Sequence, residues 1–409
     1  MKLPVGWRSA QLGDLPVRIR GGVSPVAEDR PPAPGEVGVL RLSALNGGRF
    51  KPEESKALLA GTPVAQDATL RAGTVLISRS NTADLVGATA LVQRDFPDRI
   101  LPDLIWSLDP ERDVVDPAWL SLELTASAVR KQIQAAASGT SGSMKKLSMG
   151  RLRRVKLMVP PILEQREIAG TLGIWDSAGA KVEQLLAARR RLKRGLMQQL
   201  LTGKRRFRQF RDSQWLERRL GEIVEEIPRP VAWRADRDYD LLSIRRRSGG
   251  VFCRGRLAGE RILTPQLFEA RTGDFLISRM QVVHGAWGMV PPQCDGMTVS
   301  GSYIVLRPRE PQTLEPAFLD FLSQLPPLRR AALLSSHGVH IEKMTFDPAW
   351  FMRTKITIPP TLQEQRKIVG VLVALDREIG QLSVLDGLLG RQKRGLMQQL
   401  LTGRLRVKV

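Results

Sequence analysis

The chain has 409 residues, 42% of them hydrophobic and 25% charged, and a formal net charge of +22. This length favours two domains, and the composition excludes a disordered chain. Two cysteines exclude a disulfide framework, and the excess of Lys and Arg indicates a polyanionic partner such as nucleic acid. No apolar stretch is long enough to span a membrane and the first residues lack a signal core, so we expect a soluble, cytoplasmic protein.

The chain contains an internal repeat. The segment Lys193–Gly203 returns residue for residue at Lys393–Gly403, an offset of 200 residues. At the same offset, Ala72–Arg79 matches Thr272–Arg279, but the residues that follow each of these segments differ. A shared framework with different loop tips indicates one scaffold that carries two specificities.

The predicted elements follow the same order in each half. Short β-branched runs between turn residues predict strands, and apolar stretches that begin at a proline predict helices. Pro-Pro pairs, which cannot lie inside a helix, precede two long amphipathic segments that end at Gly203 and Gly403. In chain order the elements are a strand at 73–78, a helix at 117–133, a long helix after Pro161, a strand at 302–306, a helix at 316–334 and a long helix after Pro360.

Each long segment, about 40 residues or roughly 60 Å of helix, has apolar residues at alternating spacings of four and three. This spacing is typical of a coiled-coil seam, so we expect the two helices to pack against each other and to run antiparallel. The alternative is that each helix packs separately on its own domain. The apolar residues assigned to the partner-docking helices are Leu172, Trp175, Leu186, Leu196, Leu372, Leu375, Leu389 and Leu396.

Three features of the chain occur together: duplicated halves, Pro-Pro helix starts followed by Glu-Gln-Arg, and repeated helix ends with the sequence Lys-Arg-Gly-Leu-Met-Gln-Gln-Leu-Leu-Thr-Gly. In these features the chain resembles the specificity subunits of type I restriction-modification systems. The resemblance covers essentially the whole chain. It implies an α/β (α+β) fold with two globular target-recognition domains separated by two long antiparallel coiled-coil helices. The implied segments are 1–158 and 208–357 for the recognition domains, and 159–207 and 358–409 for the spacer helices.

The resemblance also implies a function and partners. Each half would read one half of a bipartite, asymmetric site in double-stranded DNA, and the helices would set the spacing and dock two methyltransferase subunits. Motor-nuclease restriction subunits would join this core. The chain itself would hold no cofactor, whereas the assembled complex would use S-adenosylmethionine, ATP and Mg²⁺.

DNA contacts are expected from loops rich in Arg, Asn, Gln and Ser, because Arg suits the guanine edge and Asn or Gln the adenine edge. Small, basic loops suit phosphates. The predicted DNA-binding residues are Arg79, Ser80, Asn81, Thr82, Ser141, Lys145, Lys146, Arg279, Gln281, His284, His340 and Lys343. Two structural alternatives stay open: Arg79 and Arg279 as salt-bridged framework, and the loop around Lys145 as a solvated turn. The basic runs 189–194 and 204–208 face either unread DNA or an acidic partner.

The sequence contains no catalytic set that we recognise. It has neither a Gly-x-x-x-x-Gly-Lys-[Ser/Thr] phosphate loop nor the Pro-Pro-aromatic tetrapeptide of adenine methyltransferases, and His337, His340 and Cys294 do not have the spacing of a metal site. We therefore expect a non-catalytic subunit. The alternatives are the specificity subunit of a related type II methyltransferase-nuclease of the IIB or IIG kind, a fused catalytic enzyme, and a DNA-binding scaffold without sequence specificity.

Overall fold

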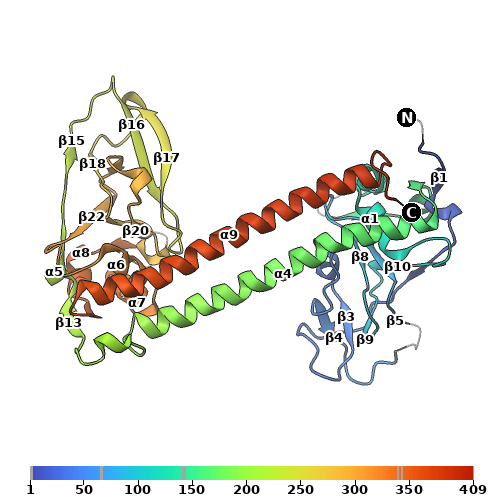
Figure 1. The fold of residues 1–409 in the computed structure, drawn as a ribbon, viewed down its shortest axis with the longest axis horizontal. Helices are drawn as coiled ribbons and strands as arrows, with labels where there is room; N and C mark the ends of the chain where they lie inside the picture. Colours follow the sequence, from blue (N-terminus) through green and yellow to red (C-terminus); the bar gives the residue numbers. More distant parts are fainter. Residues whose placement is uncertain (1–2, 65–67, 140–143, 339, 342–343, 409) are drawn as a thin grey trace. The chain divides into compact units, whose positions relative to one another are not determined.

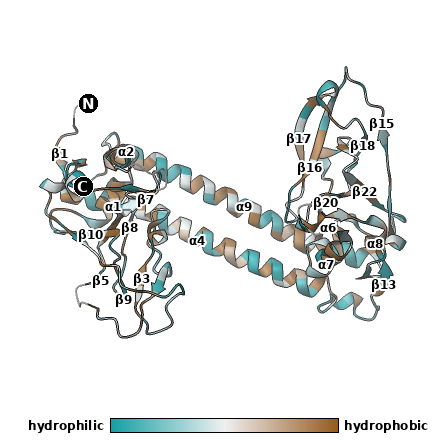
Figure 2. Ribbon diagram, turned by 180° about the vertical axis from the view of Figure 1, so that it is seen from behind, coloured by the Kyte–Doolittle hydropathy of each residue, from teal (hydrophilic) through white to brown (hydrophobic). Residues whose placement is uncertain are grey.

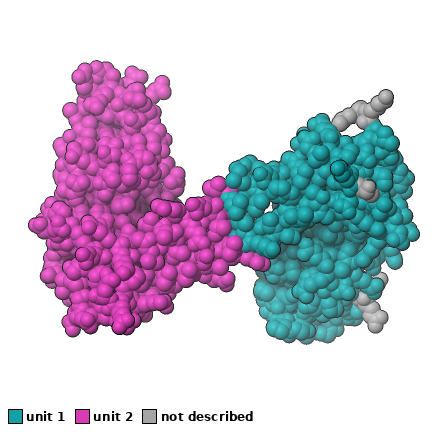
Figure 3. Space-filling model, in the orientation of Figure 1, with its two compact units in different colours: residues 1–183, 385–409 teal, residues 184–384 magenta. Residues whose placement is uncertain are grey.

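The computed structural model describes residues 3–64, 68–139, 144–338, 340–341 and 344–408. The chain forms two compact units (Figure 3). Unit 1 comprises residues 1–183 and 385–409, and unit 2 comprises residues 184–384. The boundaries fall inside the two long helices, so each unit contains the first half of one long helix and the second half of the other.

Unit 1 begins with a mixed α/β domain (Figure 1). One sheet has the order β2-β10-β6-β8, a second has the order β4-β3-β9-β5, and two ribbons pair β1 with β12 and β7 with β11. The strands are β1 Arg8–Gln11, β2 Val17–Gly21, β3 Gly38–Leu40, β4 Ser55–Ala57, β5 Thr69–Leu70, β6 Val75–Ser78, β7 Ser80–Asn81, β8 Thr89–Leu91, β9 Phe96–Ile100, β10 Ile105–Pro110, β11 Lys145–Lys146 and β12 Lys156–Val159. The short helices are α1 Pro117–Thr125, α2 Ser127–Ala136 and α3 Met149–Arg153.

Unit 2 contains the second domain. Its sheets have the orders β14-β22-β19-β20 and β15-β18-β21-β16-β17, and its ribbons pair β13 with β25 and β23 with β24. The strands are β13 Leu216–Arg219, β14 Val224–Glu226, β15 Pro230–Val231, β16 Asp238–Ile244, β17 Val251–Ala258, β18 Leu267–Glu269, β19 Phe275–Ser278, β20 Trp287–Met289, β21 Thr298–Ser300, β22 Tyr303–Pro308, β23 Ser336–His337, β24 Thr345–Phe346 and β25 Lys355–Ile358. The short helices are α5 Leu220–Ile223, α6 Pro316–Ser323, α7 Pro326–Leu334 and α8 Pro348–Met352.

The two domains share one topology, as the sequence repeat predicts. The sheet β2-β10-β6-β8 corresponds to β14-β22-β19-β20, and β4-β3-β9-β5 corresponds to β17-β16-β21-β18, to which unit 2 adds β15. In both units one strand pair of the second sheet is parallel, β3 with β9 and β16 with β21. The clearest difference is the hairpin of β16 and β17, whose strands are seven and eight residues long, against three residues each in β3 and β4.

The predicted strands and short helices are present, with one correction. β6 and β22 lie where strands were expected, and the central residues of β6 and of β19 are fully buried. The stretches expected as single helices at 117–133 and 316–334 are each two helices, α1 with α2 and α6 with α7. Ala126 and Leu325 adopt extended backbone between them. Proline follows Leu325 and disfavours helical backbone there, whereas no residue around Ala126 signals the break.

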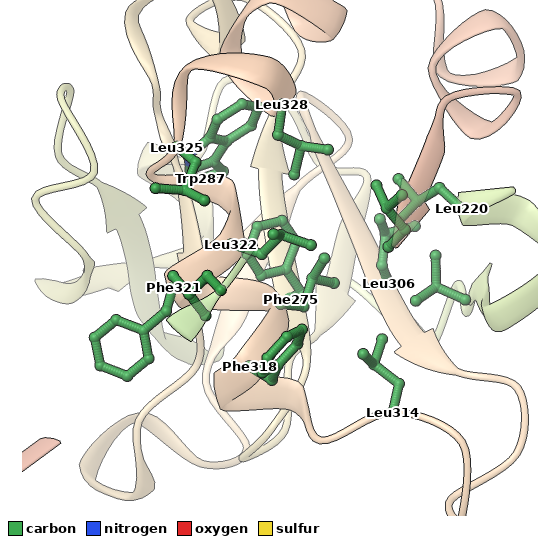
Figure 4. Packing of buried hydrophobic residues seen from close by; sticks show 14 of the residues in the cluster. Leu220, Phe275, Trp287, Leu306, Leu314, Phe318, Phe321, Leu322, Leu325 and Leu328 are labelled. Atoms are coloured by element: carbon green, nitrogen blue, oxygen red, sulfur yellow. The ribbon is translucent and has the colours of Figure 1, made fainter. Parts of the chain in front are cut away.

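Each domain has its own apolar core. In unit 2 a cluster of aromatic and aliphatic side chains from β19, β20, β22, α6 and α7 surrounds Phe275, Trp287 and Phe318 (Figure 4). The long helices contribute to the same cores: Leu172, Leu400 and Leu401 join the cluster of unit 1, while Leu200, Leu201 and Leu372 join that of unit 2. The ends of the long helices are therefore integral parts of the domains.

The two long helices are α4 Ile162–Leu200 and α9 Leu362–Leu400. Hydrophobic and hydrophilic residues alternate along both (Figure 2). Gly203 and Gly403 follow the helix ends with φ of 69° and 65°, the left-handed backbone that suits a helix stop. The first half of one helix lies with the second half of the other in each unit, and they run antiparallel. Lys393 Nζ lies 2.5 Å from Asp176 Oδ1 in unit 1, and Lys193 Nζ lies 2.6 Å from Asp376 Oδ1 in unit 2.

A buried glutamate anchors the start of each long helix. Glu164 accepts a hydrogen bond from the Trp7 indole at 2.9 Å and two from the Arg406 guanidinium at 2.6 and 2.8 Å. Glu364 is bonded in the same way by Trp215 at 3.2 Å and by Arg206 at 2.8 and 2.7 Å. Arg206 belongs to the basic run 204–208, so this part of the run closes an internal ion pair, whereas both sequence-based interpretations gave it an external partner.

A glutamine beside each anchor continues the repeat. The Gln165 amide donates to the carbonyl of Pro160 at 2.9 Å and accepts from the amide of Asp116 at 2.8 Å. Gln365 makes the equivalent bonds to Pro359 at 3.1 Å and to Glu315 at 2.8 Å. The Glu-Gln pair after each Pro-Pro therefore joins the helix to the globular domain that precedes it.

Candidate nucleic-acid interface

The first predicted loop of unit 1 is a tight turn after β6. The amide of Val86 donates to the carbonyl of Thr82 at 2.9 Å, and the amide of Gly87, at φ 74°, donates back to Ser78 at 2.9 Å. These bonds close a loop whose exposed residues are 82–85. Of the residues 79–82 that were predicted to contact DNA, only Thr82 belongs to this exposed tip.

The predicted residues before the tip are buried. Ser80 is 0% exposed and Asn81 is 8% exposed. The Asn81 Oδ1 atom accepts a hydrogen bond from the amide of Thr82 at 2.9 Å, so Asn81 shapes the tip. Arg79 is half-buried, and its guanidinium carbon lies 5.8 Å from the centre of the Trp106 ring, a cation–π contact with the framework.

The predicted lysines lie beside this loop. β11 pairs with β7, so that Lys145 lies opposite Asn81 and Lys146 lies opposite Ser80. The Lys145 ammonium donates to the carbonyl of Gly139 at 2.8 Å, whereas Lys146 is exposed. The fold therefore brings the loop of residues 79–87 and these two lysines together, although they are far apart in sequence.

Helix α2 supports the loop from one side. The Arg130 guanidinium donates to the carbonyl of Asp84 at 2.8 Å, and the Gln134 amide donates to the same carbonyl at 3.1 Å. These bonds restrain the backbone of the exposed tip.

In unit 2 the corresponding loop follows β19. The Arg279 guanidinium lies 3.3 Å from Glu226 Oε1, so Arg279 is salt-bridged to the framework, as the structural alternative expected. Gln281 and His284 are half-buried in a turn that ends at Gly285, whose φ is 69°. The exposed residue of this segment is Met280.

A second turn, which the sequence reasoning missed, lies against this loop. It joins β16 to β17 through residues 245–250. The amide of Arg247 donates to the carbonyl of His284 at 2.7 Å, and the amide of Ser248 donates to that of Gly285 at 2.8 Å. Three consecutive arginines followed by Ser-Gly-Gly between two strand-like runs were the available signal.

The two turns and α7 line a pocket of about 260 Å³. Its described lining residues are Arg246, Arg247, Val283, His284, Gly285 and Arg329. The charged side chains among them are basic, which matches the expected polyanionic partner.

Of the remaining predicted DNA-binding residues, the structure describes only His340, which does not line this pocket. His340 lies in an exposed bend of unit 2. Ser141 and Lys343 lie outside the described residues, so their prediction is untouched by the structure.

The predicted docking residues of the helices are largely covered. Leu172, Leu186, Leu372 and Leu375 are buried, and the partly buried members of the set are Trp175, Leu196, Leu389 and Leu396. A different set of large apolar side chains on the helices is exposed: Leu163, Ile174, Leu185 and Leu192 on α4, and Val373, Val384, Leu385 and Leu388 on α9. Leu163, Ile174 and Leu185 follow one another at intervals of three helical turns and therefore share one face of α4.

The described residues contain neither a metal-binding cluster nor a membrane-spanning helix. No group of three or more His, Cys, Asp or Glu side chains there is arranged to hold a metal ion. Likewise, no helix in the described part of the chain is both long and apolar enough to cross a membrane.

Comparison with known proteins gives relatives in both sequence and fold. No family model matches the chain. The chain is 23% identical over 172 residues to the specificity subunit of the type I restriction enzyme EcoEI from Escherichia coli, a match that covers 42% of this chain and 29% of that subunit. The match thus spans less than a third of that relative's length.

Solved structures match almost the whole chain. The S subunit of a type I restriction-modification system from M. genitalium superposes with a TM-score of 0.61 at 15% identity, over 98% of both chains. A second solved structure is described as the structural basis of complex assembly and conformational transition of the type I restriction-modification system. One of its chains superposes with a TM-score of 0.56 at 19% identity, over 99% of this chain and 100% of that one. In sequence over 172 residues and in fold over nearly its full length, the chain resembles the specificity subunits of type I restriction-modification systems.

Proposed function

We propose that this chain is the non-catalytic, sequence-specific DNA-binding subunit of a type I restriction-modification complex. One observation carries the proposal: two domains of the same topology, anchored to their helices by the same Glu-Gln pair, present different loops after β6 and β19. A duplicated framework with divergent tips suits a bipartite, asymmetric target, because each half reads its own sequence.

Base recognition in the first half is assigned to the exposed tip 82–85, which Asn81, Arg130 and Gln134 hold in place. Lys146 supplies positive charge beside it for the DNA backbone. In the second half the recognition surface comprises the loop 279–287 and the arginine turn 245–250, which are joined by backbone hydrogen bonds.

Two methyltransferase subunits and the motor-nuclease subunits are the proposed protein partners. Since the seam leucines are covered, docking on the helices would use the exposed apolar face of α4 around Ile174, which is 69% exposed, and that of α9 around Val384, which is 62% exposed. Ile174 and Val384 are the most exposed of the large apolar side chains on their helices, so a partner bound there would remove apolar surface from water. The same helices are proposed to set the spacing between the two half-sites.

Mapping of N6-methyladenine in the host genome tests the proposed function. A strain with intact partner genes is compared with one that lacks only this chain. We expect a two-part, asymmetric methylated motif that disappears in the deletion and returns with the gene. Unchanged methylation in the deletion strain contradicts the proposal.

Two further outcomes identify the alternatives. A motif whose cleavage needs no ATP indicates a type II enzyme of the IIB or IIG kind. Equal affinity of the purified chain for motif and random duplexes indicates a non-specific scaffold.

A further inference from the structure

We propose that the pocket of Arg247 and Arg329 in unit 2 binds a backbone phosphate of the DNA and so positions the second recognition loop. The proposal rests on the proposed DNA-binding function and assigns a role to one site within it.

The pocket is built from three separate chain segments. Arg247 comes from the turn between β16 and β17, Gly285 from the loop after β19, and Arg329 from α7. The Arg329 guanidinium donates to Ser248 Oγ at 3.2 Å, and the Trp287 indole donates to the same oxygen at 3.3 Å. Together with the two backbone bonds to His284 and Gly285, these contacts fix the arginine turn against the recognition loop.

The backbone of the turn is strained at the arginine. Arg247 and Ser248 have φ of 59° and 55°, left-handed values that are unfavourable for residues other than glycine, although glycines follow at 249 and 250. Such backbone is retained where the surrounding structure determines it, and here it places the Arg247 side chain on the pocket wall.

The concave shape of the site favours phosphate over a base. A side chain that reads a base edge must project into a groove of the duplex, whereas the phosphates are the outermost groups of DNA. Arginines that line a pocket can receive such a group, and the guanidinium fork matches phosphate oxygens. The site therefore positions the DNA and adds affinity without reading sequence.

The equivalent arginine of unit 1 is used differently. Arg130 lies as far beyond the first proline of α1 as Arg329 lies beyond that of α6. Arg130, on α2, donates to the carbonyl of Asp84 in the loop of the same unit. Arg329 is instead exposed on the pocket wall. The phosphate site is accordingly a property of the second half.

Fluorescence anisotropy with the full-length chain tests the site. The probes are a labelled 30-base-pair duplex that carries the motif found by methylation mapping and the same duplex with the second half-site scrambled, each titrated at several salt concentrations. The variants are Arg329→Gln and Arg247→Asn, because Asn tolerates left-handed backbone. Arg330→Gln is the matched control, since Arg330 is the exposed neighbour of Arg329 that does not line the pocket.

We expect both pocket variants to bind both duplexes roughly tenfold more weakly. We also expect a plot of log affinity against log salt concentration to have a slope that is shallower by about 0.9, the value for one lost phosphate contact. Arg329→Lys should retain most of the slope, since it keeps the charge. Arg330→Gln should behave as wild type, and circular dichroism should show equal folding of all variants.

Three results separate the possibilities. If wild type does not distinguish the two duplexes, the proposed function fails whatever the variants do. If wild type distinguishes them but both pocket variants match Arg330→Gln, the phosphate site is refuted alone. If a pocket variant loses discrimination at one base pair with an unchanged salt slope, the pocket reads a base and the phosphate assignment is overturned.

Discussion

At the scale of single residues, the structure separates groups that shape a loop from groups that are free to touch a ligand. Asn81 has the side chain expected of a base reader, but it is buried and bonded to the backbone of Thr82. Glu123 is another buried polar group: its Oε1 atom accepts from the amide of Met158 at 3.3 Å, and Oε2 has no hydrogen-bond partner among the described residues. Both positions lead to tests.

We predict that Asn81→Ala weakens discrimination at the first half-site by about 1–3 kcal/mol, because the tip 82–85 loses its internal restraint. Recognition of the second half-site should not change.

Lys146→Ala should instead weaken binding to all duplexes alike and reduce the salt slope by about one ion. Binding to duplexes with single substitutions in each half-site measures both effects. If Asn81→Ala loses the same binding affinity for matched and mismatched DNA, Asn81 has no part in sequence recognition.

We predict that Glu123 makes the free energy of unfolding depend on pH. Burial raises the pKa of Glu123 from 4.5 to about 8, while the weak bond from Met158 lowers it slightly. Below pH 4.5 both the folded and the unfolded chain hold the proton, so no penalty exists. Between pH 4.5 and 8 the unfolded chain loses the proton and the folded chain keeps it, so the free energy of unfolding falls as pH rises.

Glu123→Gln should remove this slope, because the amide does not titrate. We expect the variant to gain stability relative to wild type between pH 5 and pH 8, on the order of 3 kcal/mol. Urea denaturation of both proteins at the two pH values measures the difference. The same pH dependence in both proteins would show that Glu123 is ionised in the folded chain.

At the scale of elements, each long helix has in its first turn a buried glutamate that is ion-paired with an arginine. Glu364 is 0% exposed and the Arg206 side chain 13%, so their ion pair is shielded from water. Removing one partner of a buried pair leaves an uncompensated charge, which costs more than the pair contributes. The contact also links the segment after α4 to the start of α9.

We predict that Arg206→Ala lowers the free energy of unfolding by about 3 kcal/mol. The neighbouring Arg205 is exposed, and Arg205→Ala should change stability by less than about 0.5 kcal/mol. Thermal unfolding of the two variants beside wild type makes the comparison. Similar melting temperatures for Arg206→Ala and Arg205→Ala would contradict the anchoring role.

At the scale of the whole molecule, the chain contains two similar units. Each unit is completed by the second half of the long helix that begins in the other unit. The C-terminal segment after α9 returns to unit 1, where Arg406 bonds Glu164 and Leu400 joins the core. In unit 2 the segment after α4 plays the equivalent part through Arg206 and Leu200. Because each unit is closed by its own contacts, each recognition domain should act as a module.

We predict that replacing residues 1–155 with the equivalent domain of a known type I specificity subunit changes one half of the methylated motif only. The replacement must keep a tryptophan at the position of Trp7, because its indole bonds Glu164. Methylation mapping of the hybrid in a host that supplies the partners decides the outcome. A change in both half-sites would show that the two units do not read independently.

The sequence alone predicts the repeat, the two long helices and some of the short strands, because these elements follow from local signals. Pro-Pro pairs, apolar periodicity and terminal glycines act within a few residues, so α4 and α9 were predicted nearly to their ends. The β-branched runs at 73–78 and 302–306 are local signals of the same kind, and they form β6 and β22.

Which polar residues stay exposed depends on the tertiary structure. Asn81 is buried where β11 pairs with β7. Arg206 is partly buried and bonded to Glu364, which lies 158 residues away in sequence. The arginine turn 245–250 became a candidate site when backbone bonds joined it to the loop after β19. Burial and pairing depend on contacts between segments distant in sequence, so residue type and spacing predict the scaffold more readily than the binding surface.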